Sequence, residues 1–171
     1  MLKALFKLFG ERKPKASEPK HASITSYPDR IYIDTYDKVG KETWDWRSAL
    51  IVTKLPIDAT NEEIGKTVRV HLELTRYNVK IEKPKAAADR WYKYLTAHGF
   101  EAAVQLYDDA LRVNIYETGG NIMLVPTYND GSTGRSRGFH AKEWDAFKCK
   151  LTDSDEKLGA MVRKALKRCS D

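Results

Sequence analysis

The segment from Gly131 to His140 carries the side chains of this sequence that are best suited to contact a ligand or a partner. Four of its residues are charged or aromatic: Arg135, Arg137, Phe139 and His140. Guanidinium groups bind phosphates and carboxylates through paired hydrogen bonds, and an aromatic ring can stack on a base or fill a pocket in a protein. We therefore interpret the segment as a candidate partner-binding loop. A surface loop without a ligand and a phosphate or RNA site are the alternatives.

Two tryptophans form a second candidate site. Trp44 and Trp46 flank Asp45 beside a predicted strand, where side chains two residues apart share one face. Tryptophan, tyrosine and arginine are the residues that dominate binding hot spots. Core packing is the favoured interpretation for both tryptophans, and partner binding stays open for this pair.

The sequence has none of the common enzyme signatures. It contains no Gly-x-x-x-x-Gly-Lys-Ser/Thr loop, no His-Glu-x-x-His, no Cys-x-x-Cys and no Gly-x-Ser-x-Gly. Asp108 and Asp109 could act as paired carboxylates in a hydrolase, but their place between two predicted strands favours a turn. The four histidines have no spacing that brings them together. We therefore predict a protein that is not an enzyme and that has no metal site and no cofactor.

The positive charge of the chain is concentrated near the N-terminus. Of the formal net charge of +6, residues 1–20 contribute about +4. Residues 2–9 have the pattern of a short amphipathic helix that could hold weakly to an anionic membrane, and residues 11–19 are polar and contain two prolines. We predict a flexible basic tail over residues 1–22 and a single domain over residues 23–171.

The sequence also indicates the compartment and the state of the two cysteines. The sequence has no apolar run long enough to span a membrane and no secretion signal, so a cytoplasmic protein is expected. Cys149 and Cys169 lack the spacing of metal ligands, and we expect both to be buried free thiols.

Two stretches that lie 94 residues apart have the pattern of one structural unit, a strand that leads into a capped amphipathic helix. When residues 58–76 are set against residues 152–170, five pairs are identical: Glu62 and Glu156, Gly65 and Gly159, Val68 and Val162, Arg69 and Arg163, and Leu72 and Leu166. Thr60 and Glu63 form a capping-box pattern, and Ser154 precedes acidic residues in the second copy. A glycine inside a helix costs about 1 kcal/mol relative to alanine, so we expect another backbone to approach each glycine closely.

The remaining elements follow from hydrophobic periodicity. Strands are predicted at 30–36, 46–55, 102–107, 111–116, 121–128 and 143–151, and helices at 60–76, 86–98 and 154–169. Gly119 and Gly120 form a two-residue hairpin signal, and residues 129–140 are predicted to be a loop. The fold expected is α+β, with a mostly antiparallel sheet of about five to six strands and three helices, including the two similar strand–helix units.

The patterns at residues 55–65 and 154–169 resemble those of bacterial immunity proteins of contact-dependent growth inhibition, and the likeness covers roughly residues 25–170. The resemblance implies a small, cytosolic, non-catalytic protein that binds and neutralises the C-terminal toxin domain of a cognate effector. No binding position transfers from the family, so the candidate partner-binding residues are those derived above: Arg135, Arg137, Phe139, His140, Trp44 and Trp46. Occlusion of the toxin's active site is the expected mechanism. The mild basic balance does not favour a nuclease as the partner, and the alternative function is a small basic RNA-binding module.

Overall fold

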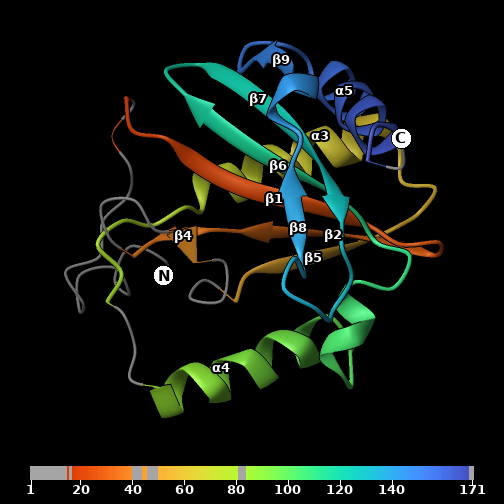
Figure 1. The fold of residues 1–171 in the computed structure, drawn as a ribbon. Coiled ribbons are helices and arrows are strands. Elements are labelled where there is room, and N and C mark those ends of the chain that lie inside the picture. The colour runs from red at the N-terminus through yellow and green to blue at the C-terminus, as the bar shows by residue number, and fades with distance from the viewer. Residues whose placement is uncertain (1–14, 16, 40–43, 46–49, 81–83, 170–171) are drawn as a thin grey trace.

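The computed structural model describes residue 15 and residues 17–39, 44–45, 50–80 and 84–169. Within these residues, seven strands form one antiparallel sheet: β1 (Lys20–Ser26), β2 (Arg30–Thr35), β5 (Val52–Pro56), β6 (Leu111–Thr118), β7 (Asn121–Asn129), β8 (Phe139–Ala141) and β9 (Phe147–Lys150). Their order is β5-β2-β1-β6-β7-β8, and β9 pairs with the other end of β7 (Figure 1). Two short strands, β3 (Asp37–Lys38) and β4 (Trp44–Asp45), form a separate pair.

Three α-helices in the described chain complete the fold: α3 (Asn61–Glu73), α4 (Pro84–Ala97) and α5 (Asp155–Lys167). Two short 3₁₀ helices, η2 (Ala103–Leu106) and η3 (Glu143–Asp145), lie in the connections. The α+β class, the antiparallel pairing and the three predicted helices are confirmed. The sheet has seven strands among the described residues, against the five to six expected.

Helices α3 and α5 pack side by side on one face of the sheet (Figure 1), whereas side chains of α4 pack with residues of the opposite face. Strand alternation explains the division, because Ile31 and Ile33 of β2 join the core under α3 and α5, and Tyr32 between them joins a second cluster with Tyr94 and Leu95 of α4. The sheet is therefore buried on one face and partly covered on the other.

The predicted close approach at the two glycines is confirmed, and each repeat unit is the partner of the other. A Cβ atom on Gly65 would lie 2.0 Å from the carbonyl oxygen of Asp155, and a Cβ atom on Gly159 would lie 1.9 Å from the carbonyl oxygen of Asn61. Only hydrogen at these two positions allows the backbones of α3 and α5 to cross at this distance.

The paired arginines of the repeat also act reciprocally. Arg69 Nε donates to Asp155 Oδ1 at 2.5 Å, and its terminal nitrogens donate to backbone carbonyls before α5. Arg163 Nε donates to Asn61 Oδ1 at 3.1 Å, and its Nη2 donates to the carbonyl of Ala59 before α3. Each helix therefore fixes the entry into the other, which gives the helix pair an approximate two-fold character.

The caps and the hairpin form as predicted. The Thr60 hydroxyl accepts from the Glu63 N–H at 3.2 Å while the Glu63 carboxylate accepts from the Thr60 N–H at 2.7 Å, and Ser154 caps α5. Gly119 and Gly120 connect β6 to β7 with φ angles of +58° and +80°, the region that favours glycine.

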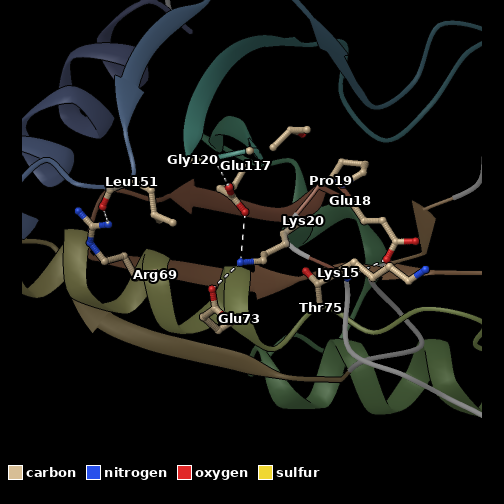
Figure 2. Close-up of polar contacts among 12 residues, drawn as sticks. Lys15, Glu18, Pro19, Lys20, Arg69, Glu73, Thr75, Glu117, Gly120 and Leu151 are labelled. Carbon is tan, nitrogen blue, oxygen red and sulfur yellow. Dashed lines mark hydrogen bonds and ion pairs between the residues drawn. The ribbon is translucent and has the colours of Figure 1, made fainter.

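The predicted tail extends too far, because β1 begins at Lys20 inside residues 1–22. Lys20 is buried at the start of the central strand β1, where its ammonium lies 2.5 Å from Glu73 and 3.2 Å from Glu117 (Figure 2). Burial lowers the pKa of Lys20, but the hydrogen bonds to the two carboxylates outweigh burial and raise it overall. Ion pairs with distant elements thus allow this lysine to start a strand. The helix predicted at 2–9 lies outside the described residues.

Three other predictions differ from the structure. Residues 102–107 were expected to be a strand, but Gln105 Oε1 accepts from the N–H groups of Glu101 and Ala102 and closes a 3₁₀ turn. The predicted loop 129–140 includes the start of β8, which pairs with β7. The predicted strand 143–151 is a 3₁₀ turn followed by β9. In the parts of the chain that the structure describes, no helix has the length and apolarity to cross a membrane.

Candidate partner-binding site

A cavity of about 410 Å³ lies on the sheet face that α3 and α5 do not cover. Its floor comes from the two central strands: His21 of β1, and Arg112, Asn114 and Tyr116 of β6. The spacing of two along β6 places its three side chains on this face. The walls come from five residues of other elements: Tyr36, Trp44, Leu106, Tyr107 and Phe139.

His21 lies between two tyrosine rings at one end of the cavity. Its ring stacks on Tyr36 at 3.9 Å and on Tyr116 at 4.3 Å, and Trp44 meets it edge-on at 5.3 Å. The side chain is buried, and within the described residues neither ring nitrogen has a hydrogen-bond partner. Burial, together with the charges of Arg112 and Lys38, lowers the pKa of His21 to about 3. At neutral pH the ring therefore offers one N–H donor and one bare nitrogen.

Arg112 occupies the other end of the cavity. Its Nε donates to Thr25 Oγ1 at 2.9 Å, and its Cζ lies 4.1 Å from the ring centre of Phe139, which stacks on Tyr107 at 5.3 Å. Burial lowers the pKa of Arg112, but nearby tyrosines and Asp34 outweigh burial and raise it overall. The guanidinium is therefore charged, buried and placed over an aromatic ring.

A buried carboxylate on the same sheet face is already engaged. Asp34 Oδ1 lies 3.0 Å from His98 Nε2, and Asp34 Oδ2 accepts from the Tyr94 hydroxyl at 3.5 Å. Both partners belong to α4 or to the residue that follows it, so this network fixes α4 against β2. Asp34 is thus a structural group.

Two of the partner-binding residues predicted from the sequence line this one cavity. Trp44 is half-buried beside His21, with Lys38 Nζ 4.7 Å from its ring centre, and Phe139 is half-buried over Arg112. Trp46 lies outside the described residues. The cavity thus joins two segments that are far apart in the sequence, and neither segment forms a site alone.

The other predicted residues belong to the loop between β7 and β8 (residues 130–138) or follow it directly. Arg135 and Arg137 are exposed, and neither forms a hydrogen bond or ion pair with another described residue. His140 is half-buried, with its Nε2 at the carbonyl of Ser136 and 3.6 Å from Asp130 Oδ2. His140 therefore supports the loop from within, while the two arginines point their charge to solvent. We call this loop and the cavity together the cavity face.

Three residues of interest escaped sequence reasoning. His21 was assigned to the tail, and Arg112 was an ordinary polar residue of an alternating strand. Trp144 in η3 is 78% exposed and borders a second groove with Met123 and Val125. Only Trp144 had a signal in the sequence, because it stands between two acidic residues, where exposure is expected. The burial of His21 and Arg112 could not be predicted, because it depends on elements that follow them in the chain.

These features define the class of the protein, a small α+β protein with an aromatic and cationic cavity on one face of its sheet. A family model described as CDI immunity protein matches residues 20–169, and the chain belongs to this family. The match confirms the resemblance noted in the sequence.

Two solved structures share the fold. One is a protein of unknown function from Neisseria meningitidis, with a TM-score of 0.76, 20% identity, and coverage of 92% of this chain and 99% of that chain. The other is from the CdiA-CT/CdiI toxin and immunity complex of Yersinia pseudotuberculosis, with a TM-score of 0.68, 19% identity, and coverage of 92% and 99%. No curated protein sequence matches significantly.

Proposed function

We propose that this protein neutralises a cognate contact-dependent growth inhibition toxin by binding its C-terminal toxin domain with the cavity face and occluding the toxin's active site. Membership of the immunity family supports the partner class. The observation that supports the surface is the cavity itself, where aromatic side chains from β4 and β8 lie near His21, whose ring nitrogens have no hydrogen-bond partner among the described residues. In this proposal the protein inhibits by contact and performs no chemistry of its own.

The cavity face has the features that such an inhibitor needs. A stable complex buries about 800 Å² on each partner around a few aromatic or arginine anchors. Trp44 and Phe139 supply aromatic anchors, and Arg135 and Arg137 supply a charged rim. The hydrogen bonds between Asp130 and Gly138 and between Gly138 and Gly131, both 2.9 Å, hold the loop in one shape before binding. A preformed loop reduces the ordering cost of association.

The RNA-binding alternative has less support. It relied on the basic tail and on the Gly-Arg loop, where Phe139 was a candidate to stack on a base, but this ring already contacts Tyr107 and the guanidinium of Arg112. These contacts compete with stacking on a base. The family match also favours a protein partner.

The test is co-purification of the full chain with the toxin domain encoded beside it, followed by titration calorimetry and a toxin activity assay. We expect one-to-one binding in the nanomolar range that abolishes toxin activity. Arg135→Ala and Arg137→Ala should weaken binding, whereas Lys66→Ala, at an exposed site on α3, should not. Absence of binding would refute the function, and unchanged affinity of both loop variants would refute the assignment of the loop.

A further inference from the structure

Arg112 holds a positive charge inside the cavity and has no ion-pair partner in the described part of the chain. Among the described residues, one side-chain hydrogen bond is made by this guanidinium, from Nε to Thr25 at 2.9 Å, and no carboxylate lies within ion-pair distance. Asp34, which shares the sheet face, is paired with His98 instead. An arginine has five N–H donors, so the edge that borders the cavity is left to bind something else.

The other groups in the cavity add to this donor excess. None of the described residues that line it is acidic. His21 contributes a buried ring with both nitrogens unpartnered, and Asn114 contributes an amide. Lys38 over Trp44, and Arg135 and Arg137 on the loop, add positive charge around the cavity. A buried charge without a partner is costly, and its retention in a rigid cavity points to a ligand of opposite sign.

We propose that the cavity is a socket for one acidic side chain of the toxin, whose carboxylate pairs with the guanidinium of Arg112 between the aromatic walls. This inference rests on the proposed function and assigns the central contact of that interface.

The geometry of Arg112 suits this role. Thr25 holds the Nε edge and Phe139 covers one face of the guanidinium, so its orientation is set before the partner arrives. The guanidinium has already lost most of its water in the free protein, so the complex gains a charge-assisted pair with little further desolvation on this side. Phe139 and Trp44 would exclude water from the pair, as the rim of a hot spot does.

The test is a double-mutant cycle between the full chain and its cognate toxin domain. Each aspartate and glutamate on the toxin surface is replaced by its amide, and affinity for the wild-type immunity protein is measured by calorimetry. We expect one amide variant to bind about 30-fold or more weakly. With Arg112→Gln, the same toxin variant should bind no more weakly than wild-type toxin does. Lys66→Gln removes the same unit charge from an exposed site on α3 and is the matched control.

The toxin variants need no change in this chain, so the proposal stays testable if Arg112→Gln fails to fold. Loss of affinity for no single amide variant would overturn the socket. Saturable binding of inorganic phosphate to the free protein, with toxin affinity unchanged by Arg112→Gln, would also overturn it in favour of a small-anion site. If wild-type toxin does not bind at all, the proposed function fails, and the socket, which rests on it, is overturned with it.

Discussion

The helix crossing at Gly65 and Gly159 yields a quantitative prediction, the effect of Gly65→Ala on the free energy of unfolding. On an isolated helix this change would stabilise by about 1 kcal/mol, because alanine has the higher helix propensity. In this fold the new methyl group would lie 2.0 Å from the carbonyl oxygen of Asp155, a backbone atom that cannot rotate away. The two helices must separate, which disturbs the core beneath them and the hydrogen bonds of Arg69.

The magnitude follows from opposing terms. Overpacking of a core costs about 1–3 kcal/mol and occasionally more. The loss of a charge-assisted hydrogen bond adds about 1.5 kcal/mol or more, and the propensity gain recovers about 1 kcal/mol. We therefore expect Gly65→Ala to destabilise the protein by about 3 kcal/mol. Urea unfolding followed by circular dichroism measures this as a lower midpoint with an unchanged slope.

A second substitution tests whether the destabilisation comes from the close contact between α3 and α5 or from any substitution in these helices. Gly159→Ala should cost a similar amount alone, but the double variant should cost less than the sum of the two, because helices already forced apart accommodate the second methyl group. Lys66→Ala, beside Gly65 but exposed, should change stability by less than about 0.5 kcal/mol. A Gly65→Ala variant as stable as wild type would refute the reasoning, and so would strict additivity.

Three further predictions concern stability and reactivity. Thr60→Ala removes the side-chain half of the capping box and should lower the free energy of unfolding by about 1 kcal/mol in thermal denaturation; an unchanged Tm would contradict the cap. The pKa values of His21 and His71 are lowered to about 3 and about 4, mainly by burial, so the unfolded chain binds more protons below pH 6.5. Stability should therefore be full above pH 6.5 and fall as the pH drops from 6.5 to 4, approaching about 1.4 kcal/mol per pH unit for each histidine. A flat profile in denaturant titrations would show that the two rings bind protons in the folded state as readily as in the unfolded chain. Burial raises the thiol pKa of Cys149 and Cys169, so both should react with a thiol reagent in urea but not in the native state, where rapid labelling would show that they are accessible.

Local signals explain which parts of the fold could be predicted. The caps at Thr60 and Ser154 and the hairpin at Gly119 and Gly120 depend on neighbouring residues, so their patterns are visible in the sequence. β1 escaped because its first residue, Lys20, is neutralised by carboxylates that are distant in the chain. The sequence around Lys20 is basic, so it does not indicate that this lysine is paired with carboxylates and begins a strand.

The same distinction applies to the candidate site. Trp44 and Phe139 could be chosen by residue type, because large aromatic side chains beside charged residues are typical of interfaces. His21 and Arg112 could not, because they lie on ordinary alternating strands and become a site when η2, β4 and β8 enclose them. The functional contribution of a residue in a sheet thus depends on what covers that sheet.

The reciprocal contacts between α3 and α5 also constrain the order of folding. α3 is synthesised before β6, β7, β8 and β9, whereas α5 is synthesised after every strand of the sheet. The backbone at Gly65 and the apolar face of α3 are covered only when α5 docks. Until then the nascent chain exposes apolar surface, a state prone to aggregation. Because the helix pair joins segments so distant in sequence, loop-closure entropy opposes its formation, and docking of α5 is expected to be a late, slow step. Docking of α5 on α3 is therefore the step at which the preceding elements of the domain become stably folded.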